Sequence, residues 1–544
     1  MAVIQQSKGN TAHVNMMTDT VIANLPPDGL RTIIRCLLSS RPEITAAFEH
    51  ETRTYIQESA GAVVNSTCPD PGLSKLKEAQ HIIRCMLGCG LGFQSLPLLS
   101  KLVVQGVQTG LATNTVEVES FLAAVDGDIV QTMTAVQKAL FVSTGVRKLS
   151  DDEMNLIETL YLALVKCQEV AQEKKQDYPY TRGLVATANV FGVSHPISKA
   201  ADDAPDTSEV PLPVEVRETF QLNGRNIPRI FSGLWQMSSP AWGAAPTSKI
   251  VDQFSKHVHS GFTAFDMADH YGDAEVVFGR FWASYPHRDA LLTATKYCVF
   301  HPMDVTREAV RDNVSERCQR LQQGKVNLLQ FHWQFYENPQ YIDALRYLAE
   351  DQRVEMIGLC NFDTKHLQRV LDCGIPIHTN QIQFSLIDSR PTVRMGEVCE
   401  KHDIKLLTYG TLCGGFLADK WLNKPEPGVY DESITPSQRK YHGMIRNWGD
   451  WTLFQELLMA LKAISIKHGV AISNVATRWV LDFPYVGAVI VGARMGISEH
   501  TDENLASFGW ALDQQDQDAI EEVLAKSRRM EMFETMGDCG GEYR

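Results

Sequence analysis

The chain has 544 residues, more than the ~100–200 of one ordinary domain, and 44% of them are hydrophobic, as in a globular protein. Its formal net charge of −14 argues against a nucleic-acid partner, because phosphate backbones are bound by clustered Lys and Arg. No apolar run approaches the ~20 residues of a membrane span, and the first residues lack a basic region followed by an apolar one. We therefore expect a cytoplasmic protein with no membrane partner.

Residues 1–190 carry helical patterns and little strand-like alternation. Apolar residues recur at helical spacing over 30–38, 79–87 and 156–170, and Ser150-Asp-Asp-Glu153 is a capping box before the third of these segments. Gly88-Cys-Gly-Leu-Gly92 lacks the last glycine of a dinucleotide fingerprint and a preceding strand, so it predicts a turn. We expect a mainly α-helical domain that serves association, localisation or the binding of a protein partner.

The 12 cysteines have no disulfide-framework spacing, and they predict reduced thiols. Cys85 and Cys89 form a C-x3-C without a second pair nearby, and His257-Val-His259 fits a helix end. We therefore expect no metal site.

A composition change separates the two halves of the chain. Pro, Asp, Ser and Ala dominate residues 191–216, which is typical of an exposed linker. The domain that follows would then occupy residues 217–544.

Short apolar runs alternate with helical patterns after the linker. The runs lie at 231–237, 263–265, 291–294, 326–331, 356–360, 379–382, 404–409 and 488–492. One intervening helix is expected over 247–260, ending before Gly261, and Asn223-Gly224 predicts a two-residue hairpin turn ahead of the first run. The alternation predicts parallel strands with crossover helices, and we expect a (β/α)8 TIM barrel.

Four of these runs end in reactive or amide side chains. Asp266 and Tyr271 follow the second run, Lys296 the third and His332 the fourth, and Asn380-Gln381 lies in the sixth. Each residue alone also fits a structural role, such as a loop cap, a solvated strand end or a core histidine. In a barrel, however, the carboxyl ends of all strands face one pocket, so together these groups predict one active site.

The four residues suit carbonyl reduction. A free phenol, with a pKa near 10, is a weak acid, and a neighbouring ammonium that is held by a carboxylate would lower that pKa. Tyr271 fits the proton donor, Lys296 the group that lowers its pKa and Asp266 the anchor of Lys296. His332 would then hydrogen-bond to the carbonyl group and orient it.

In these motifs the chain resembles the aldo-keto reductase family, whose catalytic tetrad is Asp, Tyr, Lys and His. The resemblance runs from about residue 220 to the C-terminus and leaves the N-terminal half unmatched. It assigns the tetrad to Asp266, Tyr271, Lys296 and His332. It also implies NADPH (NADP+) as cofactor, with NADH as the second option.

The resemblance implies cofactor contacts along the rest of the barrel. It places carboxamide contacts to the nicotinamide at Asn361 and Gln381, and a stacking ring at Tyr409. It places pyrophosphate contacts at Leu412 and Gly414, a 2′-phosphate contact at Arg494 and an adenine contact at Asn504. The chain departs from the family at Cys360 and Gly410, where the family usually has Ser. Trp235, Trp333 and Trp448 are candidate walls of a substrate pocket, and simple packing accounts for them equally well.

The resulting prediction is an enzyme that reduces an aldehyde or ketone to an alcohol with NADPH. Two alternatives use the same residues. One is an NAD(P)+-dependent sugar or alcohol dehydrogenase that works in the oxidative direction. The other is a cofactor-bound regulatory protein with little turnover.

Overall fold

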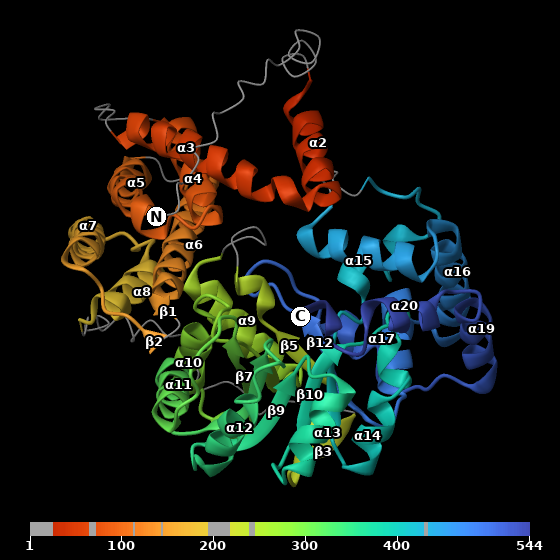
Figure 1. Cartoon of the computed structure of the whole chain (residues 1–544). Coiled ribbons are helices and arrows are strands. Elements are labelled where there is room, and N and C mark those ends of the chain that lie inside the picture. Colours follow the sequence, from red (N-terminus) through yellow and green to blue (C-terminus); the bar gives the residue numbers. More distant parts are fainter. Residues whose placement is uncertain are drawn as a thin grey trace, which may run out of the picture.

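The computed structural model describes residues 25–64, 72–112, 115–142, 145–193, 218–238, 245–428 and 434–543. Figure 1 shows two parts, a helical domain coloured red to yellow and a barrel coloured green to blue. The predicted linker over 191–216 lies outside the described residues except for its first three positions, so its exposure stays a prediction.

The N-terminal part is helical, as predicted. Its α-helices are α2 (Pro27–Ser40), α3 (Thr45–Val64), α4 (Gly72–Gly88), α5 (Gly92–Ala112), α6 (Val116–Leu140), α7 (Asp151–Glu173) and α8 (Thr181–Phe191), with two short strands, β1 (Phe141–Val142) and β2 (Gly145–Val146). Ser150 Oγ accepts from Glu153 N, and the Glu153 carboxylate accepts from Ser150 N, so the capping box is confirmed. The segment Gly88–Gly92 contains the turn between α4 and α5, as predicted, and Gly90 has φ +74° in it.

The C-terminal part is a closed barrel of eight parallel strands, which confirms the predicted fold. Its strands are β5 (Ile230–Gly233), β6 (Ala264–Asp266), β7 (Leu292–Val299), β8 (Val326–Trp333), β9 (Val354–Cys360), β10 (Thr379–Gln383), β11 (Lys405–Tyr409) and β12 (Val486–Gly492). The first strand is shorter than predicted, because the chain turns into a 3-10 helix, Trp235–Ser238, after Gly233.

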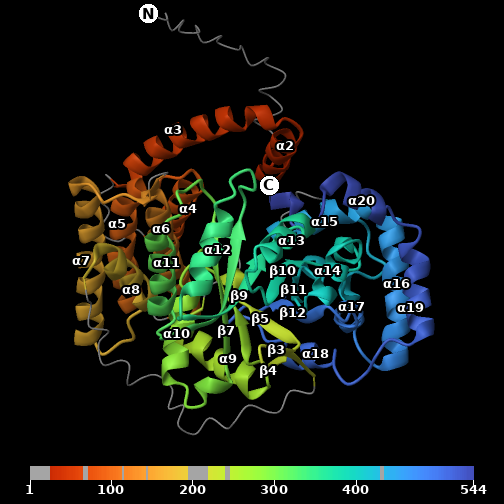
Figure 2. The same cartoon turned by 60° about the horizontal axis from the view of Figure 1, so that its bottom comes forward.

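Helices cover the outside of the barrel and extend it on one side. They are α9 (Thr247–His259), α10 (Ala274–Ser284), α11 (Arg307–Arg320), α12 (Tyr341–Glu350), α13 (Thr364–Asp372), α14 (Met395–Lys401), α15 (Pro436–Trp448), α16 (Trp451–His468), α17 (Ile472–Leu481), α18 (Thr501–Leu505), α19 (Gln514–Leu524) and α20 (Arg529–Met536). Figure 2 shows α15, α16, α19 and α20 grouped beside the barrel. Their apolar faces share a core of their own around Phe454 and Ile445.

The predicted hairpin closes one end of the barrel. Strands β3 (Thr219–Leu222) and β4 (Arg225–Pro228) pair in antiparallel fashion around Asn223 and Gly224, whose φ angles of +49° and +76° fit a two-residue hairpin turn. Leu222 and Ile227 are buried in one cluster with side chains of the barrel strands. The hairpin therefore plugs the barrel, and the opposite end carries the carboxyl ends of the strands.

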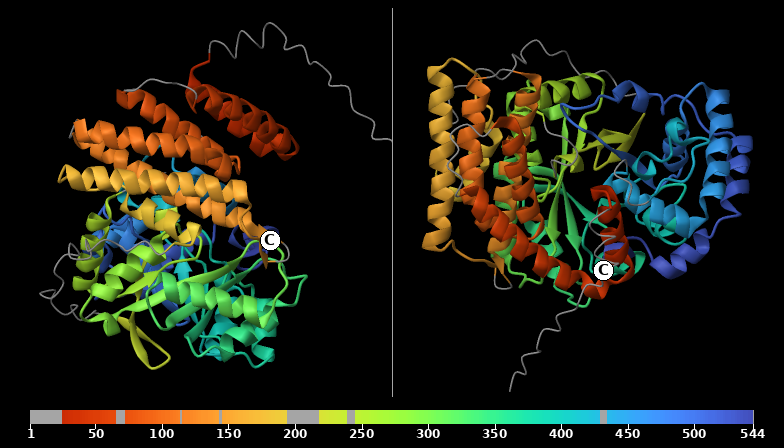
Figure 3. Two further views of the ribbon diagram at one scale, coloured as in Figure 1. Left: turned by 90° about the vertical axis from the view of Figure 1, so that its left-hand side faces the viewer. Right: turned by 90° about the horizontal axis from the view of Figure 1, so that it is seen from above.

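The helical domain lies against the barrel (Figure 3), and residues of α6 and α8 contribute to the contact. Arg182 of α8 donates to both carboxylate oxygens of Asp273, at 2.6 and 2.5 Å, and both side chains are buried. A Cβ added to Gly272 would lie 3.3 Å from Gln131 Nε2 of α6. The helical domain thus contacts the loop that directly follows Tyr271.

Among the described residues, no helix combines the length and apolar character needed to cross a bilayer. Every cysteine in the described part of the chain is a free thiol.

We predict that limited proteolysis cuts first within residues 191–216. A buried loop rich in Pro and Asp could not satisfy its backbone groups, so this segment should be exposed to the protease.

The fragment 214–544 carries every predicted catalytic and cofactor residue, so we expect it to fold and bind NADPH. It should melt at a lower temperature than the full chain, because it lacks Arg182 beside Asp273. Mass spectrometry of the fragments and NADPH titration check this. An insoluble fragment, or a soluble one that does not bind NADPH, would show that the halves share one core.

Candidate active site

A carboxylate, an ammonium and a phenol form a hydrogen-bonded series at the ends of β6 and β7. Lys296 Nζ donates to Asp266 Oδ2 at 2.7 Å, to Met267 O at 2.9 Å and to Tyr271 Oη at 3.3 Å. All three donor positions of the ammonium are therefore used. Asp266, Tyr271 and Lys296 are all buried. The structure thus brings together three of the four residues predicted for catalysis.

Burial and neighbouring charges shift the pKa values of Tyr271 and Lys296 in opposite directions. Burial raises the pKa of Tyr271, and the positive charge of Lys296 lowers it by less, so the pKa lies above that of a free phenol. The sequence-based expectation about Lys296 therefore has the right direction, but burial has the larger effect. Burial lowers the pKa of Lys296, but the charge and hydrogen bond of Asp266, together with the interaction with Tyr271, outweigh burial, and the net shift is upward. Lys296 thus remains an ammonium that can stabilise a phenolate.

His332, the fourth predicted residue, lies at the end of β8 and is buried. A series of rings connects it with Tyr271. The His270 ring lies 4.8 Å from the Tyr271 ring and 5.0 Å from Phe300, and the Phe300 ring lies 5.5 Å from His332. The imidazole therefore belongs to the same end of the barrel as the phenol.

Two glutamines inside the barrel hold the second oxygen of Asp266. Gln330 Nε2 and Gln381 Nε2 donate to Asp266 Oδ1 at 2.9 and 2.7 Å, and Gln381 Nε2 also donates to Gln330 Oε1 at 2.8 Å. In this structure the amide nitrogen of Gln381, predicted to contact nicotinamide, is used within the protein. Sequence reasoning missed Gln330. Its position two residues before His332, on the same face of a strand, is the signal that could have revealed it.

The residues predicted for the nicotinamide lie next to each other at the barrel mouth. Tyr409 Oη donates to Asn361 Oδ1 at 2.8 Å and lies 3.0 Å from Tyr543 Oη. Lys440 Nζ of α15 donates to the same Tyr543 hydroxyl at 3.1 Å. Asn361 is buried and has a left-handed backbone, with φ +58°. An aromatic ring and a carboxamide are thus presented together, as the resemblance implies.

The C-terminal segment 537–543 forms one border of this mouth, which no motif predicted. Asp538 Oδ2 accepts from Thr364 N at 2.9 Å, and Glu542 pairs with the buried Arg390 at 3.0 Å. At Gly540, with φ +75°, an added Cβ would collide with the backbone carbonyl of Asn361. The segment is therefore tied to the barrel on both sides of its glycine.

The turn after β11 carries the predicted pyrophosphate contacts. The amides of Cys413 and Gly415 donate to Gly410 O and Leu412 O at 2.9 and 2.8 Å. These two amides are used within the turn, and the pyrophosphate contacts at Leu412 and Gly414 stay a prediction. The structure also explains why Gly410 replaces the usual Ser. An added Cβ there would collide with the hydroxyl of Tyr441, which α15 places over the turn.

Arg494 and Asn504, predicted for the adenosine-phosphate end, line one pocket of about 310 Å³ that is partly open to solvent. His500 lines it as well, and Ser232 and His257 form its opposite side. The structure thus brings the two predicted residues together beyond β12, in a setting that combines a basic side chain with a carboxamide.

For two of the three tryptophans considered as pocket walls, the structure supports the packing alternative. Trp333 is 1% exposed, stacks on Phe331 with ring centroids 5.8 Å apart and donates from Nε1 to Phe335 O at 2.7 Å. Trp448 is 0% exposed and belongs to the core beside α16. Both are packing residues, because their strand and helix turn them away from the mouth. Trp235 is 41% exposed and remains a candidate.

One group of described residues has spacing that would suit a metal ion. The ligand atoms of Asp269, His270 and Cys298 lie within 4.8 Å of one another. Asp269 already accepts from Cys298 N at 2.9 Å and pairs with His270 at 3.0 Å, and Arg317 lies 3.6 Å away. Its charge is satisfied within the protein, so we assign no metal to this group.

Comparison with known proteins finds relatives of the C-terminal barrel. The model of the Aldo/keto reductase family matches residues 229–525, which is more than half of the chain. Aldo-keto reductase YhdN of Bacillus subtilis is 24% identical over 314 residues, covering 54% of this chain and 89% of the relative. Flagellar radial spoke protein 5 of Chlamydomonas reinhardtii is 32% identical over 145 residues, covering 26% and 27%. A solved glycerol dehydrogenase of Gluconobacter oxydans is 22% identical, with a TM-score of 0.49 over 57% of this chain and 97% of its own.

Proposed function

Because the chain belongs to the aldo/keto reductase family and is therefore an NAD(P)H-dependent oxidoreductase, we propose that it reduces an aldehyde or ketone to an alcohol with NADPH. The observation that carries the proposal is the position of Lys296 Nζ, which joins the Asp266 carboxylate to the Tyr271 hydroxyl. This is the arrangement that a phenol needs in order to act as an acid.

Each of the four predicted catalytic residues has one task in this mechanism. Tyr271 gives its hydroxyl proton to the carbonyl oxygen as that oxygen becomes an alcohol. Lys296 stabilises the phenolate that remains, and Asp266 keeps the ammonium charged and in place. His332 hydrogen-bonds to the carbonyl oxygen and orients it. When bound, NADPH supplies the hydride that reaches the carbonyl carbon.

The raised pKa of Tyr271 has a consequence for this mechanism. The phenol stays protonated at neutral pH, so the acid form that reduction requires is the resting form. Lys296 then acts when the proton leaves, because the ammonium attracts the phenolate more strongly than the phenol. The oxidative direction uses the same groups in reverse, starting from the phenolate.

Residues that suit the cofactor lie at the barrel mouth, beyond β12 and in the turn after β11. Asn361 and Tyr409 offer a carboxamide and a ring at the mouth, with Gln381 below them in the barrel. Arg494 and Asn504 line the pocket beyond β12, where a guanidinium suits a 2′-phosphate and a carboxamide suits adenine. Leu412 and Gly414 lie in the turn after β11. We propose these residues as the contacts to the cofactor.

Steady-state oxidation of NADPH with a panel of carbonyl compounds tests the proposal. The panel should hold short aliphatic aldehydes, aromatic aldehydes, sugar aldehydes, ketones and 1,2-dicarbonyls. We expect turnover with at least one class, together with release of the alcohol. Tight NADPH binding with no turnover across the panel, and no oxidation of the matching alcohols, would instead identify a cofactor-bound regulatory protein.

We predict that Arg494→Ala weakens NADPH binding much more than NADH binding, by about 1.5–3 kcal/mol if one charge-assisted contact is lost. Only NADPH carries the 2′-phosphate that the guanidinium would hold. Fluorescence titration with both cofactors measures this difference. A matched control is Arg288→Ala, which removes an arginine that stacks on Trp282 and should leave both affinities unchanged. Equal losses for NADPH and NADH would refute the role of Arg494.

A further inference from the structure

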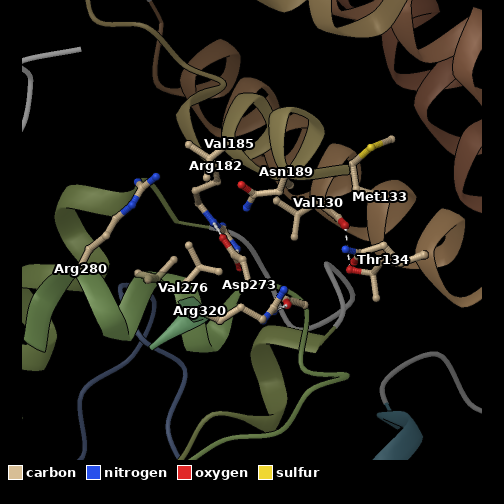
Figure 4. A pocket seen from close by; sticks show the side chains of 14 residues that line it. Val130, Met133, Thr134, Arg182, Val185, Asn189, Asp273, Val276, Arg280 and Arg320 are labelled. Atoms are coloured by element: carbon tan, nitrogen blue, oxygen red, sulfur yellow. Dashed lines mark hydrogen bonds and ion pairs between the residues drawn. The ribbon is translucent and has the colours of Figure 1, made fainter. Parts of the chain in front are cut away.

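A second pocket lies where the helical domain meets the barrel (Figure 4). It encloses about 440 Å³, part of it open to solvent. Helices α6 and α8 form one side, and α10 with the loop after Tyr271 forms the other. No residue predicted for catalysis or cofactor binding lines it.

Three arginines and one carboxylate line this pocket. Arg182 comes from α8, Arg280 from α10 and Arg320 from the end of α11, whereas Asp273 is the single acidic residue of the lining. Three positive charges thus face one negative charge. Asn189 and Gln137 add carboxamides that can donate hydrogen bonds.

Two of the arginines have partners within the protein. Arg182 donates to both oxygens of Asp273 through Nε and Nη2. Arg320 donates from Nε to Glu275 Oε2 at 2.7 Å and from Nη2 to Gly272 O at 2.6 Å. These contacts fix the positions of both guanidinium groups in the pocket wall.

Arg280 is different, because its Nε and Nη2 atoms are buried and have no hydrogen-bond partner. Burial lowers the pKa of Arg280, the charge of Asp273 opposes this shift only in part, and the net direction is downward. A buried guanidinium edge without a partner costs free energy. Figure 4 shows Arg280 reaching from α10 toward the helical domain.

Asp126 of α6 is a second carboxyl whose charge acts on Arg280. It accepts from Gly183 N at 2.7 Å. Burial raises its pKa to about 7, although the charge of Arg182 opposes the shift. Near neutral pH only a part of the molecules therefore carries this negative charge, and Asp126 compensates the charge of Arg280 only in part.

We propose that this pocket binds a phosphate group, held by the Nε–Nη2 edge of Arg280. Arg182 presents the same edge to the two oxygens of Asp273, so the chain itself shows how such an edge holds an oxyanion in this pocket. Arg182 is paired with Asp273 and Arg320 with Glu275, so the guanidinium of Arg280 is the lining charge that a ligand would neutralise. A phosphate bound there has further oxygens for the carboxamides of Asn189 and Gln137, which a single carboxylate lacks. The phosphate would lie between α8 and α10 and stabilise the contact of the two domains.

Thermal unfolding of the full chain without NADPH tests this site. Inorganic phosphate, acetate and chloride are titrated at matched ionic strength. We expect phosphate to raise the unfolding midpoint saturably, by about 2 °C or more, and acetate to have a clearly smaller effect. Arg280→Met should remove the phosphate effect, and without phosphate this variant should melt at or above the wild-type temperature, because it no longer buries an unpaired charge.

Two controls separate this site from others. Arg494→Ala should keep the phosphate effect, because that residue belongs to the proposed cofactor pocket, and a loss there would place the phosphate at the cofactor site and contradict the proposal. Arg346→Met removes an exposed arginine of α12 and should also keep the effect. A wild-type protein that responds equally to phosphate and chloride, an acetate effect as large as that of phosphate, or an Arg280→Met variant that keeps the response would each overturn the assignment.

Discussion

Replacing Tyr271 with Phe should lower kcat for carbonyl reduction by a factor of at least about 100, while the Kd for NADPH changes by no more than a few-fold. The substitution removes only the hydroxyl, which acts on the proton and lies beside Lys296 Nζ. Lys296→Met should lower kcat to a similar extent, because it removes the charge that stabilises the phenolate. Steady-state kinetics with a separate NADPH titration check both effects.

A neighbouring tyrosine provides the control for this prediction. Tyr297 follows Lys296 on β7 and is similarly buried, and its hydroxyl donates to Met303 Sδ at 3.6 Å. Adjacent residues of a strand point to opposite faces, so Tyr297→Phe should leave kcat nearly unchanged. If Tyr271→Phe kept more than about a tenth of the wild-type kcat with chemistry rate-limiting, Tyr271 would not be the general acid.

Replacing Arg182 with Met should destabilise the protein by about 3–5 kcal/mol at neutral pH, because it leaves the Asp273 carboxylate buried without its partner. Thermal and denaturant unfolding measure the loss. Arg346→Met, which breaks an exposed pair with Asp343, should cost no more than about 1 kcal/mol. The double variant Arg182→Met/Asp273→Asn should recover part of the loss, since it no longer buries a charge. A loss of less than about 1 kcal/mol in Arg182→Met would mean that the pair does not hold the domains together.

The pH dependence of this effect has a definite sign. Burial raises the pKa of Asp273, but the charge and hydrogen bonds of Arg182, together with the charge of Arg320, outweigh burial, and the net shift is downward. In the wild type the pair therefore stabilises the fold above the unfolded-state pKa of about 3.9, and this contribution is lost as the pH falls through the lower folded-state pKa. Without Arg182, burial alone raises the folded-state pKa. The variant should thus differ little from the wild type at pH 3 and differ fully at pH 7.

The sequence was sufficient for the barrel strands and for the place of Asp266, Lys296 and His332 on them, because both depend on local order. A strand such as β8 is a buried apolar run, and its carboxyl end must carry His332 to the barrel mouth. The turn at Asn223-Gly224 needs positive φ at both residues, which this pair of residues adopts readily. These features follow from a few neighbouring residues, so reading along the chain finds them.

Other parts of the site depend on contacts between distant segments. Tyr543 reaches Tyr409 only because the C-terminal segment is tied down at Asp538 and Glu542. Arg182 meets Asp273 across 91 positions, and neither lies in a recognisable motif. For Trp333 the sequence leaves both a pocket wall and packing open, because an aromatic residue at a strand end looks the same whether it faces a pocket or a helix. Only the direction of its side chain, set by the strand register, separates the two cases.

The measurement that tests the central claim most directly uses NADPH labelled with deuterium at the transferable position of C4. The wild-type enzyme and an active carbonyl substrate are allowed to react, and the alcohol is analysed by mass spectrometry. We predict one deuterium on the former carbonyl carbon for each NADPH consumed, and loss of this product in Tyr271→Phe. Tight NADPH binding without deuterium in any product, or equal labelling by Tyr271→Phe at the wild-type rate, would contradict carbonyl reduction by this site.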